Sequence, residues 1–323
     1  MPAGGTRASG AVKELVQRLL EGDRRALARV ISYVEDDTPE GHQALRLLYP
    51  RSGRAHTVGV TGPPGSGKST LACALAREFR SRGRSLGIVA VDPSSAFTHG
   101  ALLGDRIRMQ ELTADPEVFM RSMATRGFLG GLAATTSEVV AVLDAAGKDV
   151  VLIETVGAGQ DEVEIAGAAQ TTVLVNTPAT GDDIQMMKAG ILEVADVLVV
   201  NKADLPGADT LALQLTSMLS LAPQPSRPLP VLKTVATGVD GIGELADAIE
   251  GHRRYLEESG ELEQHRLDQA RRQVLALVHH QLVEDLLRRT GNERRLEKLA
   301  RAVARRQVDP HSAARKLIEG AGT

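Results

Sequence analysis

A glycine-rich segment that follows a short apolar run carries the clearest chemical signal in the sequence. Gly62 and Gly67 are separated by four residues, and Lys68 and Ser69 follow directly. Glycines at this spacing let backbone N–H groups close around phosphate oxygens at the positive end of a helix. The lysine neutralises the outer phosphates, and the serine hydroxyl ligates Mg²⁺. We therefore expect a phosphate-binding loop made of Gly62, Pro63, Pro64, Gly65, Ser66, Gly67, Lys68, Ser69 and Thr70.

A second segment indicates which base is bound. The residues Asn201-Lys202-Ala203-Asp204 end the apolar run 197–200. An aspartate there can accept hydrogen bonds from both the ring N–H and the exocyclic amine of guanine, whereas adenine presents no such pair of donors. Asn201 and Lys202 would brace this loop. A third base-proximal segment is expected after the last apolar run, where the backbone N–H of Ala236 would meet the guanine oxygen. Its members are Val235, Ala236 and Thr237.

Acidic residues near the ends of predicted strands are candidates for a Mg²⁺ site. Glu154 closes the run 150–154, where its carboxylate would hold Mg²⁺ through water, because this ion keeps most of its hydration shell. Asp92 closes another run, and Asp105 follows it in the sequence. Each of the two could join the metal or balance an arginine. The candidate metal ligands are therefore Ser69, Asp92, Asp105 and Glu154.

The residues after Glu154 are candidates for acting on the γ-phosphate. Gly157 could offer its backbone N–H to that phosphate, and Gln160 could orient the attacking water. Together with Lys68 and Glu154, they predict Mg²⁺-dependent hydrolysis of GTP to GDP and phosphate.

The elements that must position these residues follow an alternating pattern. Short apolar runs rich in β-branched residues are separated by helical patterns, which is typical of buried parallel strands joined by crossover helices. The runs are 56–61, 86–92, 150–154, 172–177, 197–201 and 230–235. We expect an α/β fold with a doubly wound, mostly parallel sheet over 55–251. A helical segment over 1–54 would precede it, and a helical extension over 252–323 would follow.

The two flanking segments show helical periodicity. In the first, Asp23 is placed to cap the second of two predicted helices. In the second, an apolar stripe from Leu267 to Leu286 precedes an arginine-rich helix over 293–307. Such a stripe must be covered by its own α/β domain or by a second chain.

Composition excludes several classes of protein. Of the 323 residues, 42% are hydrophobic and 24% are charged, as in ordinary globular proteins. With 4 Phe, 3 Tyr and 0 Trp, and a net charge of −3, the chain offers little base stacking and no overall attraction to nucleic acid or anionic lipid. A single cysteine excludes an internal disulfide framework. No apolar run suits a signal peptide or a membrane span, so we expect a cytoplasmic protein.

The combination of motifs resembles the MeaB/ArgK family of P-loop GTPases, which includes the human methylmalonic aciduria type A protein. The segments that carry the resemblance are GPPGSGKST, VDPSS, GDRIRM, TRGFLGG, IETVGAGQDE and GDDIQMMKAGILEVADVLVVNKAD. They fall within residues 10–260. Val235 stands where such GTPases usually have serine.

The resemblance implies a partner and a mechanism. It predicts a GTPase chaperone, typically a homodimer, for an adenosylcobalamin-dependent acyl-CoA mutase, chiefly methylmalonyl-CoA mutase. Adenosylcobalamin would be met only through that mutase, whose cofactor loading the chaperone gates and which it protects from inactivation. The segment 177–188 would be a switch, with Asp182, Gln185 and Lys188 as its candidate residues. Lys188 could reach a carboxylate such as Glu154 in one nucleotide state.

Two other functions fit a phosphate-binding loop. A nickel-insertion GTPase for hydrogenase or urease stores metal through Cys and His clusters, but the lone Cys73 is expected in the core, and His279 and His280 do not share a helical face. A small-molecule kinase would use GTP or ATP on an acceptor, against which Asn201–Asp204 argues.

Overall fold

The computed structural model describes residues 4–92, 112, 114–124, 131–155, 168–178, 195–221, 227–238, 240–288 and 292–319. They form two compact units, Met1–Gln269 and Ala270–Thr323.

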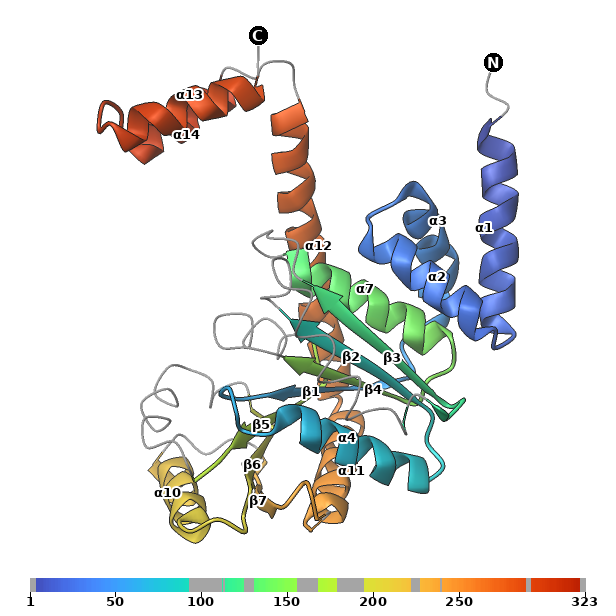
Figure 1. Ribbon diagram of the computed structural model, residues 1–323, viewed down its shortest axis with the longest axis vertical. Coiled ribbons are helices and arrows are strands. Elements are labelled where there is room, and N and C mark those ends of the chain that lie inside the picture. The colour runs from blue at the N-terminus through green and yellow to red at the C-terminus, as the bar shows by residue number, and fades with distance from the viewer. Residues whose placement is uncertain are drawn as a thin grey trace. The chain divides into compact units, whose positions relative to one another are not determined.

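The centre of the first unit is a seven-stranded sheet in which every neighbouring pair is parallel (Figure 1). The strand order is β3-β2-β4-β1-β5-β6-β7. The strands are β1 (His56–Thr61), β2 (Leu86–Asp92), β3 (Val118–Ala124), β4 (Val150–Thr155), β5 (Thr171–Asn176), β6 (Val197–Asn201) and β7 (Val231–Thr234). This confirms the predicted α/β class with a parallel sheet.

Burial on both faces explains why the central strands read as continuous apolar runs. Every residue of β1, β4, β5 and β6 is buried. One face packs on α4 (Lys68–Ser81) and α11 (Ile242–Ser259), through residues such as Val58 and Leu152. The other face packs on α7 (Gly131–Ala145) through Val151 and Ile153, while α10 (Ala208–Leu221) covers β5 and β6. A parallel sheet is buried on both faces because its crossover helices cover both of them.

The N-terminal helices share the core of the sheet. They are α1 (Gly4–Leu20), α2 (Arg24–Glu35) and α3 (Pro39–Leu48), followed by the 3₁₀ turn η1 (Tyr49–Arg51). As predicted, Asp23 caps α2, since its side chain accepts hydrogen bonds from the backbone N–H groups of Arg25 and Ala26. Val30 and Ile31 are fully buried in the cluster that also holds Val139 of α7.

A carboxylate fastens the linker between these helices and the sheet. Asp144, near the end of α7, accepts hydrogen bonds from three consecutive backbone N–H groups: Gly53 at 2.5 Å, Arg54 at 3.1 Å and Ala55 at 3.1 Å. The linker is thereby held against α7 just before β1 begins.

Strand β3 was missing from the sequence prediction. It lies at the edge of the sheet, and Arg121 and Ser122 interrupt its apolar pattern. The Arg121 guanidinium pairs with the Glu35 carboxylate of α2, so this polar position is satisfied by a contact that lies far away in the sequence.

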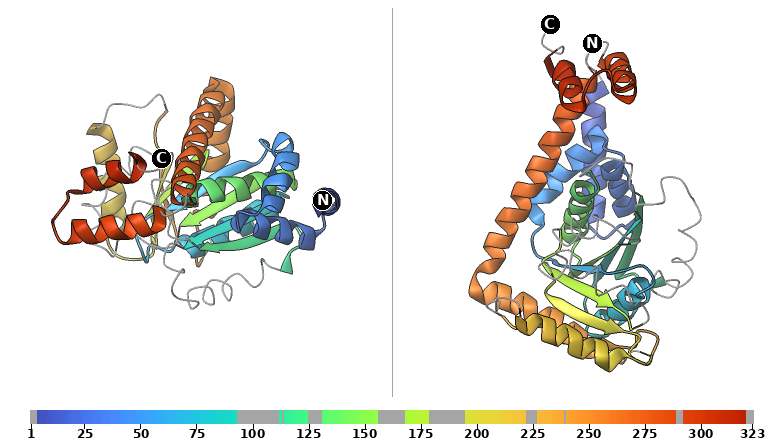
Figure 2. Two further views of the ribbon diagram at one scale, coloured as in Figure 1. Left: turned by 90° about the horizontal axis from the view of Figure 1, so that it is seen from above. Right: turned by 90° about the vertical axis from the view of Figure 1, so that its left-hand side faces the viewer.

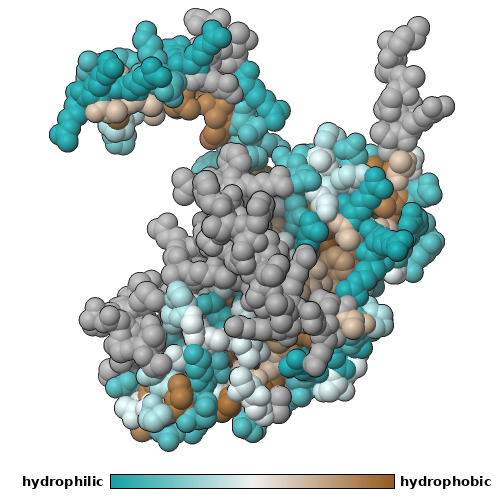
Figure 3. Space-filling view, viewed as in Figure 1, coloured by the Kyte–Doolittle hydropathy of each residue, from teal (hydrophilic) through white to brown (hydrophobic). Residues whose placement is uncertain are grey.

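The second unit contains the end of α12 (Glu261–Arg288), α13 (Asn292–Ala304) and α14 (Pro310–Glu319). Helices α13 and α14 lie side by side (Figure 2) and bury Ala313 and Leu317. The arginine-rich helix was predicted, whereas α14 was not. Residues 270–323 carry twelve Arg and Lys against six Asp and Glu. Their outer surface is largely hydrophilic, with an apolar strip along one edge (Figure 3).

No residue of α12 is buried. Its large apolar side chains stay exposed, among them Leu267 at 61% and Leu282 at 62%. Within the part of the chain that the structure describes, no helix has the length and apolar character needed to cross a membrane.

Candidate functional site

The phosphate-binding loop connects the carboxyl end of β1 to the first turn of α4 (Figure 1). Gly62, Gly65 and Gly67 have φ values of 141°, 78° and 88°, in the region that favours glycine. A Cβ on Gly62 would lie 2.1 Å from the carbonyl oxygen of Val175, and one on Gly67 would lie 2.5 Å from Nδ2 of Asn201. The loop therefore requires glycine at these two places for space as well as for backbone conformation.

Lys68 brings a positive charge into this loop. The side chain is 6% exposed, and its Nζ donates hydrogen bonds to the carbonyl oxygens of Gly62 at 2.5 Å and Pro63 at 3.0 Å. These contacts hold the ammonium group beneath the loop, at the amino end of α4. Backbone N–H groups at a helix start and a buried ammonium together make a strong site for phosphate oxygens.

Two candidate metal ligands meet beside the loop. The Ser69 hydroxyl, in the first turn of α4, donates a hydrogen bond to Oε1 of Glu154, near the end of β4. Glu154 is 1% exposed. A hydroxyl and a buried carboxylate are oxygen donors of the kind that Mg²⁺ prefers. The donor set fits Mg²⁺, which would bind at Ser69 and Glu154 and keep water in its remaining positions.

The second predicted loop lies directly against the first. Nδ2 of Asn201 donates to the carbonyl oxygen of Ser66 at 2.9 Å, and Nζ of Lys202 donates to that of Gly65 at 2.9 Å. Lys202 has a φ of 56°, which turns the chain sharply after β6. The Asp204 side chain is exposed at the end of this turn. Base-side and phosphate-side loops thus meet through side-chain-to-backbone hydrogen bonds.

The third predicted segment follows β7. Oδ1 of Asn201 accepts hydrogen bonds from the Thr234 hydroxyl at 3.1 Å and from the backbone N–H of Ala236 at 3.3 Å. The backbone N–H of Val235 donates to the carbonyl oxygen of Asp240. Ala236 therefore lies next to the asparagine of the second loop, and all three predicted loops gather at the carboxyl edge of β1, β6 and β7.

The structure does not place several of the predicted residues. Asp105, Gly157, Gln160 and Lys188 lie outside the described residues, and so do Asp182 and Gln185. The backbone of Asp92 ends β2, but its side chain is not described. Their roles remain predictions.

Sequence reasoning overlooked Asn176, the last residue of β5. It is 2% exposed and lies on the strand next to β1. A polar residue that closes a buried apolar strand is the signal that could have revealed it, as it did for Glu154.

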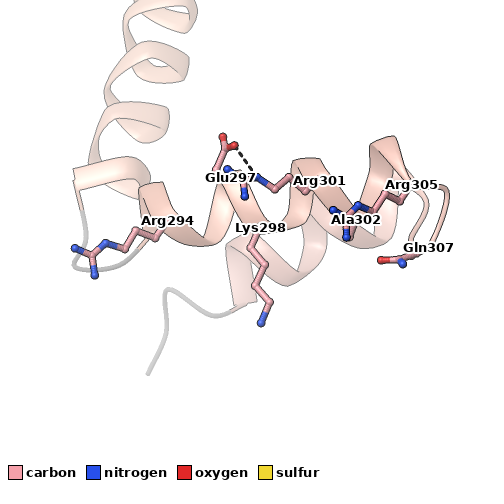
Figure 4. Close-up of a pocket in the computed structure, with 7 residues that line it drawn as sticks. All are labelled: Arg294, Glu297, Lys298, Arg301, Ala302, Arg305 and Gln307. Atoms are coloured by element: carbon pink, nitrogen blue, oxygen red, sulfur yellow. Dashed lines mark hydrogen bonds and ion pairs between the residues drawn. The ribbon is translucent and has the colours of Figure 1, made fainter.

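The second unit contains a hollow that is lined mainly by basic side chains (Figure 4). It is about 630 Å³ in volume and is lined by α13 and the turn after it, with Arg294, Lys298 and Arg301 at helical spacing on α13 and Arg305 directly after the helix ends. Arg301 pairs with Glu297 at 3.0 Å. Its lining contains none of the residues of the three loops.

The fold and the three loops define a nucleotide-binding protein of the P-loop class, with a loop suited to guanine. The chain matches the family model described as methylmalonyl-CoA mutase-associated GTPase MeaB over residues 27–291. It is 46% identical over 312 residues to a protein of Pyrococcus abyssi, covering 95% of this chain and 96% of that one. It is 32% identical over 328 residues to the mitochondrial methylmalonic aciduria type A homolog of Mus musculus, covering 95% and 79% of the two chains.

A solved structure agrees with these relationships. The crystal structure of an LAO/AO transport system kinase superposes with a TM-score of 0.74 at 27% identity, covering 97% of this chain and 98% of that chain. The chain belongs to the MeaB family of P-loop GTPases. The resemblance seen in the sequence is confirmed, and the protein is a GTPase.

Proposed function

We propose that this GTPase is a Mg²⁺-dependent chaperone that gates adenosylcobalamin loading of an acyl-CoA mutase and protects or reactivates it. Methylmalonyl-CoA mutase is the proposed partner, since the family is described by its association with that enzyme. The observation that carries the proposal is the joining of the phosphate loop to the guanine loop through Asn201 and Lys202, in a chain that matches the family over both loops.

The described residues of the site have different proposed roles in GTP binding and hydrolysis. Lys68 neutralises charge on the outer phosphates, and the amino end of α4 offers backbone N–H groups to them. Ser69 and Glu154 would hold Mg²⁺, which supplies charge neutralisation as negative charge develops on the transferring phosphoryl group. Asp204 selects guanine, while Asn201 holds the base-side loop at a fixed position relative to the phosphates.

The segment 177–188 is the proposed switch. It starts directly after β5, and Pro178 Cβ lies 3.6 Å from the position of a Cβ built on Gly207, in the loop that follows Asp204. The start of the segment thus lies close to the turn that connects the guanine loop to α10. A partner that prefers one arrangement of the segment must change nucleotide affinity in the same proportion.

The exposed apolar residues of α12 support a homodimer. Val274, Leu275 and Val278 are 58%, 53% and 42% exposed, and they recur at helical spacing. An apolar stripe of this length favours contact with another protein surface. We propose that a second copy covers it.

GTP turnover with and without a purified acyl-CoA mutase tests the proposal. The mutase should raise the rate for the wild type, and Asp182→Ala, Gln185→Ala and Lys188→Ala should lower the stimulated rate while sparing the basal one. Gln214→Ala, at an exposed position of α10, serves as the matched control and should be stimulated normally. If no acyl-CoA mutase changes the rate, or if all three variants respond like the wild type, the proposal fails.

A further inference from the structure

Three polar side chains end three neighbouring strands on one face of the sheet. In the parallel register Val60 lies opposite Glu154, so Thr61 lies opposite Thr155. Thr61 is also opposite Leu174, which is two residues before Asn176. Because side chains alternate along a strand, Thr155, Thr61 and Asn176 share one face, and Glu154 lies on the face covered by α4.

These side chains are buried, and each has a polar atom for which the described part of the chain offers no hydrogen-bond partner. Thr61, Thr155 and Asn176 are 1%, 3% and 2% exposed. The hydroxyl oxygens of Thr61 and Thr155, and Nδ2 of Asn176, form no hydrogen bond with any residue that the structure describes. Buried polar groups in native proteins are nearly always paired, so an unpaired one calls for an explanation, such as a bound water, ion or ligand. Asn176 is the most costly of the three to leave unpaired, because its amide nitrogen carries two donor hydrogens.

The backbone around Asn176 lies next to the phosphate loop and next to the strand that leads into the guanine loop. On one side, the carbonyl oxygen of Val175 lies against Gly62, where a Cβ would come within 2.1 Å of it. On the other side, Asn176 lies opposite Val200 of β6, the residue directly before Asn201 of the guanine loop. Asn176 therefore ends the strand that lies between β1, which leads into the phosphate loop, and β6, which leads into the guanine loop.

We propose that Asn176 is a nucleotide-positioning residue whose amide donates a hydrogen bond to an oxygen atom presented there when the guanine nucleotide binds. The oxygen belongs to the nucleotide itself or to a phosphate-loop carbonyl that the nucleotide moves. Asn176 directly precedes the segment 177–188, so a bond made only in the occupied state also fixes where that segment begins. The inference rests on nucleotide binding by this GTPase and is independent of the mutase.

Asn176→Leu tests the role, because leucine has a similar volume and lacks the donor. Without nucleotide, the variant should melt at the same temperature as the wild type or higher, since an unpaired buried polar group has been removed. Its Kd for GDP should rise about tenfold, the loss expected for one hydrogen bond to a charged or strongly polar acceptor. Thr136→Val removes another buried, unpartnered hydroxyl, on α7 rather than at a strand end, and should leave the Kd unchanged.

Calorimetric titration with GDP, GMP and guanosine identifies the source of the oxygen. A penalty seen with GDP but not with guanosine assigns it to the phosphates or to the loop that they order. An equal penalty with all three assigns it to the nucleoside. Wild-type affinity for GDP in Asn176→Leu overturns the proposal, and so does a lowered melting temperature with unchanged affinity, which is the mark of a purely structural residue.

Asn176→Asp keeps the test decisive if the leucine variant does not fold. Aspartate has the same size but presents an acceptor in place of the donor. It should weaken GDP binding more than tenfold, because like charges repel and the bond is lost. Unchanged GDP affinity in this variant contradicts the proposal.

Discussion

The side-chain amide of Asn201 donates a hydrogen bond of 2.9 Å to the carbonyl oxygen of Ser66, and so joins two loops that are 135 residues apart in the chain. Its Oδ1 accepts from Thr234 and from the backbone of Ala236. One buried side chain thus connects the phosphate-binding loop with both base-side loops. A change in the position of the guanine loop is therefore expected to shift the phosphate-binding loop as well.

We expect Asp204→Asn to move base preference from guanine toward xanthine. The carboxylate accepts two hydrogen bonds from guanine, and an amide would present a donor to one of the same atoms. At about 1.5 to 3 kcal/mol for each bond to a charged group, GTP affinity should fall at least about 100-fold. Competition binding with GTP and xanthosine triphosphate measures the change. An unaltered GTP affinity would refute the role of Asp204, and the exposed neighbour Leu205→Ala is a suitable control.

Lys68→Ala and Glu154→Ala should separate binding from turnover. Removing Lys68 takes a buried positive charge away from the phosphates, so triphosphate binding should fall by orders of magnitude. Removing Glu154 leaves the loop charged and affects the metal, so the nucleotide should still bind while kcat falls about 100-fold or more. Equilibrium binding and single-turnover hydrolysis distinguish the two. Equal losses of affinity in both variants would count against this division of roles.

The protein should lose stability as the pH rises toward neutrality because of Glu138. Burial raises the pKa of this carboxyl group in α7 to about 7, from an ordinary value of 4.5, with the nearby Asp37 adding in the same direction and His42 opposing it. The stabilising effect of a raised carboxyl pKa is full below 4.5, where both folded and unfolded chains are protonated, and it is lost as pH passes 7.

Glu138→Gln tests this pH dependence. The variant should melt like the wild type near pH 4.5 and higher than the wild type at pH 8, since glutamine never ionises. Thermal denaturation across this range, with exposed Glu244→Gln as the control, is the measurement. If the difference in melting temperature between the wild type and the Glu138 variant is the same at every pH, Glu138 does not titrate in this range.

Light scattering should report a particle of twice the 34.3 kDa chain mass. Placing a carboxylate in the exposed apolar stripe of α12, as in Val278→Glu combined with Leu282→Glu, should yield the single chain, because burying an unpaired charge in an interface is costly. His279→Glu adds a carboxylate at an exposed position of α12 outside the stripe and should remain a dimer. A wild type that is monomeric at micromolar concentration would rule out the proposed dimer.

Six of the seven strands of the sheet were predicted, and β1, β2 and β6 at their observed boundaries, because short runs rich in β-branched and apolar residues favour buried strands in an α/β fold. β3 was not predicted because the polar Arg121 interrupts its apolar pattern. Arg121 pairs with Glu35, which lies 86 residues away in the sequence, so no local pattern indicates this contact. Asp23 was recognisable because a cap acts on the residues next to it.

In the candidate site, too, the features that could be predicted are those that depend on residues close together in the sequence. The spacing of the glycines and Lys68 predict a phosphate-binding loop, because all the residues that form it are adjacent in the sequence. The bonds of Asn201 to Ser66 and Thr234 depend on strand order, which places β6 near β1 and beside β7 and which the sequence does not specify. Asn176 was not predicted as a site residue for a related reason, since an asparagine at the end of a strand is also common as the start of an ordinary turn.

The three hydrogen bonds that Asp144 accepts from residues 53–55 bear on how the protein unfolds. Because the N-terminal helices share a continuous core with the sheet and are fastened to α7 by this carboxylate, they gain stability that they could not have alone. Amide hydrogens in α2 and in β4 should therefore exchange with solvent at a common, slow rate through one cooperative opening. The helices that precede the phosphate-binding loop are in this sense part of the same folding unit as the strand that carries Glu154.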